Sequence, residues 1–490
     1  MTSENRLKIL FVTSELAPLV STGGLADVAG ALPKALHARG HDVRVAMPCY
    51  RSIPEAHRGT PYCYCEADLG KKMAHGSLRQ SLVPGTTIPL YFIEHEGYFG
   101  REKPYGVGAY EYDDNAERFC FFSLALLHGV PQTGWMPDVI HCHDWHTAAI
   151  PAYVRTRHGI DPAWHGKPTL FTIHNLAFQG RYGAEKFAST GLEPWLFTPE
   201  YLEYEGDMNL MKAAIAFATK INTVSPRYAR EIQTLEYGAG LDGMLRTRSA
   251  DLSGILNGVD YATWSPEIDP HIARQYSKSD LRGKSACKRE VQAAFGLPKR
   301  DVPLFGVVSR LFWQKGVDLI VDALDRILAE DLQLVVLGTG DPHLEQRLLS
   351  AMRQYLSKMS VKLGFDVPLS HQVQAGSDFL LMPSRYEPCG LSQLYSLAYG
   401  TVPIVRRTGG LADSVKDLNA VHKKHGTATG IVFVPLTPEA LHKSVVRALD
   451  LYRDPAALLA VRQAGMREDY SWEQACVHYE ALYREAIGPA

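Results

Sequence analysis

The sequence lacks any apolar run close to the roughly 20 residues that a membrane-spanning helix needs. Its beginning, MTSENRLKILFVTSE, lacks the apolar core of a secretory signal peptide and runs directly into a strand-like segment. The formal net charge is only −2, so charge gives no argument for binding nucleic acid or an anionic membrane. These absences predict a cytoplasmic protein with neither nucleic acid nor membrane as a partner.

Cysteine motifs and paired carboxylates are also missing. The eight cysteines are scattered, Cys63 and Cys65 are the only close pair, and no pair of pairs suited to zinc occurs. No Asp-x-Asp is present, which argues against the usual metal clamp for a diphosphate. The sequence therefore predicts a reduced protein that uses no metal and no cofactor.

Two motif-based alternatives remain open. The segment HCHDWH (141–146) places three histidines and an aspartate within six residues, as in some metal-dependent hydrolases, and His174 could add a ligand. Strand alternation puts His141 and His143 on one face, with the chain turning at Asp144. A nicotinamide dehydrogenase is the second alternative, but no Gly-x-Gly-x-x-Gly follows a strand, and LGTGDPH supplies only the first pair.

The sequence does contain two series of short, continuously apolar segments separated by helix-like stretches. A length of 490 residues favours two domains. Continuous apolar runs indicate strands buried on both faces, hence parallel sheets covered by helices and a doubly wound α/β fold in each domain. The expected strands are 8–13, 43–47, 138–142, 169–173 and 221–225, then 304–309, 333–338, 379–382, 402–405 and 430–434.

Polar residues gather directly after these segments. In open α/β sheets, ligands bind beyond the carboxyl ends of the strands. The sequence therefore predicts a cleft lined by side chains from many strand ends, namely Glu15, Asp144, His174, Asn257, Arg310 and Glu387.

The hexapeptide TGGLAD occurs twice, at Thr22–Asp27 and Thr408–Asp413. Each copy follows an expected strand and opens an expected helix, and a third turn, Glu387–Leu391, precedes the helix-like SQLYSLAYG. Glycines let a backbone approach a ligand, and amides at helix starts favour anions. Together with Arg310 and Lys315, these turns predict a diphosphate bound between two domains.

Several motifs together resemble bacterial glycogen synthases and plant starch synthases. They are STGGLADVAGALPKAL, HCHDWHT, TIHNLAFQG, NGVD, SRLFWQKG and PSRYEPCGLSQLYSLAYGTVPIVRRTGGLADSV, in family order from residue 8 to about 415. The resemblance implies two Rossmann-like domains facing across a deep cleft, the GT-B glycosyltransferase fold. It also implies an N-terminal acceptor-side domain (1–255), a C-terminal nucleotide-sugar-binding domain (256–465), and a final helix (466–490) that crosses back to the first domain.

The implied reaction transfers glucose from ADP-glucose to the non-reducing end of an α-1,4-glucan, either glycogen or a malto-oligosaccharide, with retention and without metal. Arg310 and Lys315 match the family's cationic pair, which would stabilise the leaving ADP. Glu387 matches its essential carboxylate, and Asp144 and His174 match residues near the sugar. The remaining expected substrate contacts are Glu15, Ser21, Gly23, Gly24, Asp27, Asn257, Phe365, Cys389, Gly390, Leu391 and Thr408.

Three positions depart from related patterns. Ser21 stands where this branch usually has lysine, so a donor-binding charge is missing. Phe365 replaces a tyrosine, which keeps stacking on adenine but loses the hydroxyl. The wider glycosyltransferase group often has a second glutamate where Tyr395 stands, but a tyrosine is expected there in this branch. The missing charge at Ser21 leaves a non-catalytic glucan-binding or regulatory homologue as another alternative.

Overall fold

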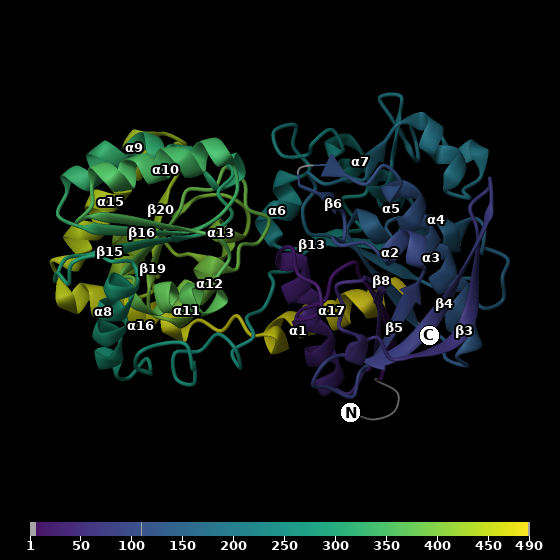
Figure 1. Ribbon diagram of the computed structural model, residues 1–490, viewed down its shortest axis with the longest axis horizontal. Helices are drawn as coiled ribbons and strands as arrows, with labels where there is room; N and C mark the ends of the chain where they lie inside the picture. The colour runs from purple at the N-terminus through teal and green to yellow at the C-terminus, as the bar shows by residue number, and fades with distance from the viewer. Residues whose placement is uncertain (1–5, 109, 489–490) are drawn as a thin grey trace. The chain divides into compact units, whose positions relative to one another are not determined.

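The computed structural model describes residues 6–108 and 110–488, which group into two compact units. The first unit comprises the residues up to Val224, then Ala229–Gly258, and Trp472 onward; the second comprises Ser225–Tyr228 and Val259–Ser471. Each unit is built around its own sheet (Figure 1). Within the described ranges, no helix is long and apolar enough to cross a bilayer.

The sheet of the first unit has the strand order β14-β13-β9-β8-β1-β2-β5-β4-β3. The strands from β14 to β5 pair in parallel, whereas β4 pairs antiparallel with both β5 and β3. The strands are β1 (Lys8–Val12), β2 (Asp42–Pro48), β3 (Thr60–Asp68), β4 (Met73–Leu82), β5 (Pro89–Glu94), β8 (Val139–His143), β9 (Thr169–Ile173), β13 (Lys220–Thr223) and β14 (Leu252–Gly254). The helices are α1 (Gly24–Ala38), α2 (Glu96–Phe99), α3 (Asn115–Gln132), α4 (Ala149–Arg155), α5 (Leu210–Phe217), α7 (Asp242–Thr247) and α17 (Trp472–Ile487), and α6 (Pro226–Glu231) lies where the units divide.

Helix α17, at the C-terminal end of the described chain, belongs to the first unit and lies beside α1 (Figure 1). Its Glu480 carboxylate accepts hydrogen bonds from Arg39 at 2.6 and 2.9 Å and lies 2.9 Å from His41 Nε2. The hydroxyl of Tyr483 lies 2.8 Å from His141 Nδ1, on strand β8. Charged and buried polar contacts therefore attach this helix to residues more than 300 positions earlier.

The sheet of the second unit is wholly parallel, with the order β17-β16-β15-β18-β19-β20. Numbered along the chain, this is the doubly wound order 3-2-1-4-5-6. The strands are β15 (Leu304–Val308), β16 (Gln333–Gly338), β17 (Met359–Leu363), β18 (Phe379–Met382), β19 (Val402–Arg406) and β20 (Ile431–Phe433). The helices are α8 (Lys284–Ala294), α9 (Val317–Ala329), α10 (Pro342–Gln354), α11 (Val367–Gly376), α12 (Ser392–Ala398), α13 (Gly409–Ser414), α14 (Ala420–His425), α15 (Pro438–Tyr452) and α16 (Pro455–Arg467).

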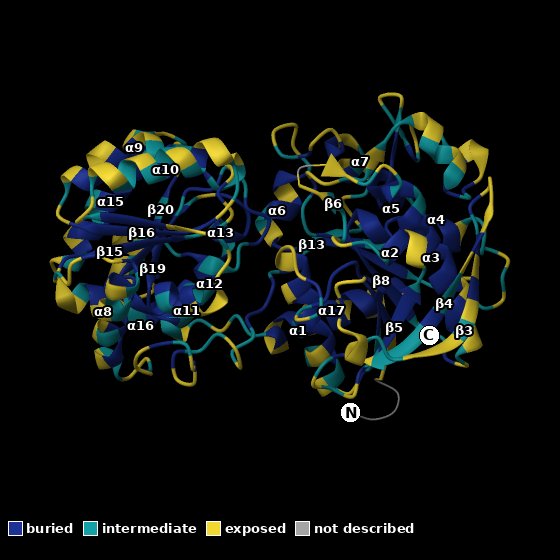
Figure 2. Ribbon diagram, in the orientation of Figure 1, coloured by how far each residue is buried: buried dark blue, intermediate teal, exposed yellow. Residues whose placement is uncertain are grey.

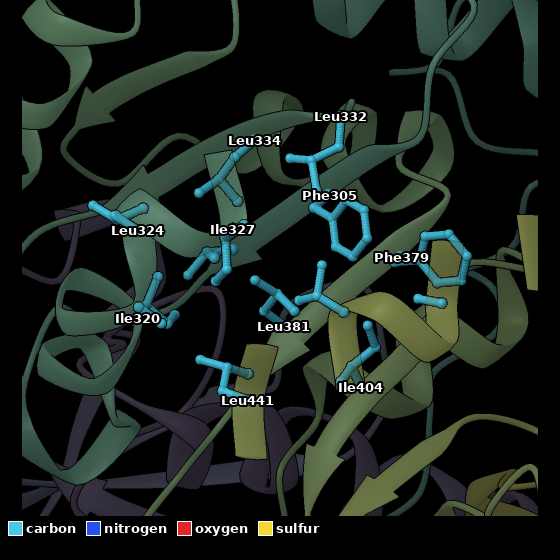
Figure 3. Packing of buried hydrophobic residues seen from close by; sticks show 14 of the residues in the cluster. Phe305, Ile320, Leu324, Ile327, Leu332, Leu334, Phe379, Leu381, Ile404 and Leu441 are labelled. Carbon is cyan, nitrogen blue, oxygen red and sulfur yellow. The ribbon is translucent and has the colours of Figure 1, made fainter. Parts of the chain in front are cut away.

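Both faces of this second sheet are buried, as its continuous apolar strands predict. Leu334 and Val336 of β16 pack into one hydrophobic cluster, whereas the alternate residues Val335 and Leu337 pack into another. Helices α9 and α10 cover the first face, and α8 and α11 cover the second (Figure 1). The larger cluster is shown in Figure 3, and Figure 2 shows buried strands between helices whose outer surfaces are exposed.

The helix starts of the second unit follow from local sequence. The Asp341 carboxylate accepts hydrogen bonds from the amides of His343 and Leu344 at 2.8 and 3.2 Å, and Pro342 occupies the first helical position. Thr437 and Asp454 cap α15 and α16 in the same way, each followed by proline. A capping oxygen satisfies amides that lack a helical partner, and proline needs none, so these dipeptides fix where each helix begins.

All ten strands expected from sequence are present, and the predicted doubly wound α/β class is confirmed. The largest difference in bounds is at β13, which ends at Thr223 rather than Ser225.

Candidate active site

The strand order of the second unit identifies where a ligand site should lie. The order reverses between the neighbouring strands β15 and β18, and the loops after these two strands meet at that switch point. Arg310 and Lys315 follow β15, and Glu387 follows β18. The three residues that the family resemblance marks as catalytic in this unit thus come from the two loops at the switch point.

Glu387 and Lys315 form a nearly buried ion pair. The Lys315 ammonium lies 2.8 and 2.6 Å from the two carboxylate oxygens of Glu387, and the Ser384 hydroxyl donates to one of them at 3.0 Å. The Glu387 side chain is 5% exposed and that of Lys315 is 20% exposed. Three donor contacts therefore fix the carboxylate, and the carboxylate fixes the lysine beside the loop where a ligand would bind.

The second TGGLAD copy packs against the loop that carries Glu387. A Cβ on Gly409, whose φ is +41°, would lie 1.9 Å from the Glu387 carbonyl oxygen. A Cβ on Gly410 would lie 2.0 Å from the carbonyl oxygen of Cys389, and the Gly410 amide donates to the Glu387 carbonyl at 3.0 Å. Glycine is required here by close backbone packing within the protein.

The other residues predicted for this unit divide into buried and exposed positions. Cys389 and Thr408 are buried. Gly390 has a φ of +72° and, with Leu391, leads into α12, so the predicted turn before that helix is confirmed. Arg310 and Phe365 are exposed, with Phe365 87% exposed after β17.

Tyr395, at the position where many glycosyltransferases have glutamate, belongs to an aromatic stack. Its ring lies 3.8 Å from that of Trp264 at an interplanar angle of 3°, and the ring of His371 also stacks on Trp264 at 3.8 Å. A tyrosine at position 395 therefore contributes aromatic packing.

The first unit has its own switch point, between β1 and β8, where the strand order again reverses. Glu15 follows β1 and Asp144 follows β8. The Glu15 carboxylate accepts hydrogen bonds from the Thr22 amide at 2.6 Å and from the Tyr105 hydroxyl at 2.8 Å. Glu15 therefore holds the start of the first TGGLAD copy in place.

The first TGGLAD copy differs from the second in its surroundings. Ser21, Gly23, Gly24 and Asp27 are exposed, and Gly23 precedes α1. A Cβ on Gly23 would meet no atom within 4 Å, and its φ of −173° is available to any residue. Packing within the protein therefore does not explain the glycine at position 23, whereas it does explain those at 409 and 410.

Asp144 has a conformation that L-residues rarely adopt, with φ 54° and ψ 179°. Its carboxylate accepts a hydrogen bond from the His174 amide at 2.8 Å. Burial, reinforced by the negative charge of Glu15, raises the pKa of Asp144 to about 7, although amides of His174 and Asn175 oppose the shift. Such strained, electrostatically perturbed residues concentrate at functional sites.

The histidines of HCHDWH are buried, and two of them, His141 and His143, form hydrogen bonds to neighbouring strands and loops. Thr172 donates to Asn222 at 2.5 Å, so His141 Nε2, 2.6 Å away, must donate to Thr172, and His141 Nδ1 accepts from Tyr483. Both nitrogens of His141 are thus occupied. The described residues contain no group of three or more His, Cys, Asp or Glu arranged to hold a metal, so the geometry gives the hydrolase alternative no support.

The imidazole ring of His174 contacts that of His143. Its Nε2 lies 2.9 Å from Nδ1 of His143, and burial lowers the pKa of His174 to about 3. His174 is therefore a neutral hydrogen-bonding group at neutral pH. Asn257, after β14, is buried, and its Oδ1 has no hydrogen-bond partner among the described residues.

A cavity of about 370 Å³ in the first unit is lined in part by residues that follow Asp144 and His174 in the sequence. Its lining combines rings with hydrogen-bonding groups: Glu111, Trp145, Ala177, Phe178, Gln179, Gly180, Arg181, Tyr204 and Ala239. Such a lining suits a sugar, because rings pack on its C–H faces and polar groups reach its hydroxyls. The sequence analysis missed these residues, although Trp145 and Phe178 lie inside the motifs it singled out.

A larger open groove of about 1030 Å³, which His37 and Thr87 help to line, contains none of the predicted site residues.

Comparisons with known proteins agree with this arrangement. The model for the starch synthase catalytic domain matches residues 8–247, and that for glycosyl transferases group 1 matches 288–459. The protein is thus a glycosyltransferase with the two-domain GT-B fold. A glycogen synthase of Anaeromyxobacter sp. (strain Fw109-5) is 46% identical over 99% of this chain and 100% of its own length. A glycogen synthase of Moorella thermoacetica is 45% identical over 98% and 97%.

The chain belongs to the glycogen synthase and starch synthase family. The solved catalytic domain of starch synthase IV from Arabidopsis thaliana, bound to ADP and acarbose, matches with a TM-score of 0.90 and 32% identity, covering 98% of this chain and 99% of that one. A sucrose-phosphate synthase from Thermosynechococcus elongatus, at 17% identity and a TM-score of 0.57, shares the fold.

Proposed function

We propose that the protein transfers glucose from ADP-glucose to the non-reducing 4-hydroxyl of an α-1,4-glucan, with retention at the anomeric carbon and without a metal ion. The Glu387–Lys315 ion pair at the switch point of the second unit is the observation that carries the proposal. Membership in the family supports the reaction, and the starch synthase IV structure, bound to ADP, supports the choice of donor.

In the second unit, the two cations act on the leaving group. When the bond between glucose C1 and the phosphate oxygen breaks, negative charge grows on ADP. Lys315, held by Glu387, and the exposed guanidinium of Arg310 stabilise that charge, which is the role a metal ion has in other transferases. The Glu387 carboxylate orients the sugar and offsets positive charge on the ring in the transition state.

The proposed bond changes need no further reactant. The acceptor O4 attacks C1 on the face that the phosphate leaves, and the O4 proton passes to the departing phosphate oxygen. Residues 390–391 offer backbone amides to the phosphates, and Phe365 stacks on adenine. The second unit thus acts as the nucleotide-sugar side of the enzyme.

In the first unit, Asp144 and His174 hold the sugar by hydrogen bonds. Neutral His174 suits contact with a sugar hydroxyl, because it donates and accepts without charge. The cavity lined by Trp145 and Phe178 receives the acceptor. The exposed start of α1 at Gly23 lets a phosphate oxygen approach the backbone.

The proposal is tested by offering ADP-glucose and UDP-glucose separately, with glycogen as acceptor. We expect faster transfer from ADP-glucose, and NMR of the product should show new α-1,4 linkages. Inverted β linkages would contradict the retaining mechanism, and faster transfer from UDP-glucose would contradict the donor.

A further inference from the structure

Two large aromatic side chains stand exposed on the loop that carries Lys315. Trp313 is 61% exposed and Phe312 is 44% exposed. The two residues are neighbours in sequence and lie two and three residues before Lys315. Single exposed aromatics are ordinary, but adjacent ones beside a candidate active site indicate a binding surface.

The loop that presents these rings is fixed by the loop that carries Glu387. The Arg385 amide donates to the Gln314 carbonyl at 2.9 Å, and the Arg385 guanidinium donates to the Trp313 carbonyl at 2.7 Å. Gly316 adopts a left-handed conformation in which a Cβ would lie 2.2 Å from the Pro383 carbonyl oxygen. The rings therefore project from a rigid backbone, which lowers the entropy cost of binding a ligand on them.

The Arg385 guanidinium supports one face of the Trp313 ring. The Arg385 guanidinium carbon lies 4.4 Å from the ring centroid and is itself held by the Asp318 carboxylate at 2.6 Å. The high exposure of Trp313 leaves the opposite face available. An electron-rich ring face attracts the weakly positive C–H groups of a pyranose.

We propose that Trp313 and Phe312 form a stacking platform for consecutive glucosyl units of the acceptor glucan. The proposal rests on the proposed function for the identity of the polymer. Exposed rings on two neighbouring residues suit a repeating ligand better than a single adenine base, for which the proposed function assigns the exposed Phe365. The platform adds affinity for chains long enough to reach it, so it favours long acceptors over short ones.

The test uses three variants: Trp313→Ala, Trp313→Tyr and Phe312→Ala. The control is Trp195→Ala, which removes a tryptophan of the first unit that is 53% exposed, close to the exposure of Trp313. Calorimetry measures binding of maltoheptaose without donor, and steady-state kinetics measure KM for maltoheptaose, maltotriose and ADP-glucose. Aromatic contacts are worth about 0.5–1.5 kcal/mol, so Trp313→Ala should raise Kd and KM for maltoheptaose by about two- to twelvefold. Trp313→Tyr should recover most of the affinity, and the KM for ADP-glucose should stay within about twofold.

Unchanged maltoheptaose constants in Trp313→Ala would overturn the platform, as would a rise in KM for ADP-glucose alone, which would mark a base-stacking residue. A rise equal to that in Trp195→Ala would also overturn it. The calorimetric measurement of maltoheptaose binding needs no catalysis. If the protein transferred no glucose, the proposed function would be refuted, but the binding data would still show whether Trp313 and Phe312 form the platform.

Discussion

Substituting one glycine in each TGGLAD copy should give opposite results, although the two hexapeptides are identical. Gly409→Ala should destabilise the fold, and Gly23→Ala should leave the fold intact but weaken donor binding. The difference arises because a Cβ on Gly409 meets the Glu387 carbonyl oxygen at 1.9 Å, whereas a Cβ on Gly23 meets nothing within 4 Å.

The magnitudes follow from these environments. At Gly409, φ is +41°, and a left-handed conformation costs a non-glycine residue about 1–2 kcal/mol. Overpacking against backbone adds about 1–3 kcal/mol, so the free energy of unfolding should fall by roughly 2–5 kcal/mol. At Gly23, exposed and extended, the change should be within about 0.5 kcal/mol. A methyl group where a phosphate approaches the backbone should raise KM for ADP-glucose by about three- to tenfold, or ~0.7–1.4 kcal/mol.

Urea unfolding of both variants gives the stability change, and steady-state kinetics with saturating glycogen give KM for ADP-glucose. If Gly23→Ala is as stable as the wild type and has the same KM for ADP-glucose, the proposal that a phosphate approaches the backbone at the first TGGLAD copy would be refuted. Equal loss of stability in the two variants would refute the packing argument for the second.

Four further predictions concern named side chains and the medium. Glu387→Gln and Lys315→Met should each lower kcat by about 10²–10³. The double variant should have a kcat little lower than that of the slower single variant, because the two side chains are paired at 2.6 and 2.8 Å. A double variant whose loss equals the product of the two single losses would contradict a functional pairing of the two residues. Ser21→Lys should raise kcat/KM for ADP-glucose by about tenfold or more, since Ser21 is exposed and a charge-assisted hydrogen bond is worth about 1.5–3 kcal/mol; an unchanged value would show that the charge is not needed. Asp144→Asn should raise the Tm more at pH 8 than at pH 5. The Asp144 carboxyl ionises near pH 4 in the unfolded protein and near pH 7 in the folded protein, so the native state holds one more proton between these pH values. The stability of the wild type therefore falls as the pH rises from about 4 to about 7. An equal Tm change at the two pH values would contradict the raised pKa. Transfer should persist in excess chelator, and a loss restored by a divalent ion would revive a metal-dependent mechanism.

Sequence patterns predicted ten strands that pair in parallel, but they missed β5, β14 and β17, which also have parallel partners, and the antiparallel β3 and β4. Strands that are buried on both faces are the easiest to predict, and β16 (Gln333–Gly338) is apolar along almost its whole length. By contrast, β3 and β4 form an antiparallel hairpin with many exposed residues, and MAHGSLRQSL of β4 shows no clear alternation. The edge strand β17, MSVKL, ends in two exposed residues and was missed for the same reason.

The sequence predicts which residues follow the strands at the candidate site, but it does not predict which of their side chains contact one another. The sequence marks Lys315 and Glu387, yet their pairing over 72 residues depends on β15 and β18 being neighbours. Identical TGGLAD copies gave no hint that only the second packs against another loop. The exposure of Trp313 likewise depends on where that loop lies, so no periodicity in SRLFWQKG could reveal it.

The most direct measurement of the central claim is the incorporation of radiolabelled glucose from ADP-glucose into glycogen, by wild-type protein and by Glu387→Gln side by side. The account predicts label in polymeric glycogen with the wild type, and incorporation about 10²–10³ slower with the variant, which should remain folded at the assay temperature. No label in glycogen with the wild type, or equal rates for the two proteins, would contradict it.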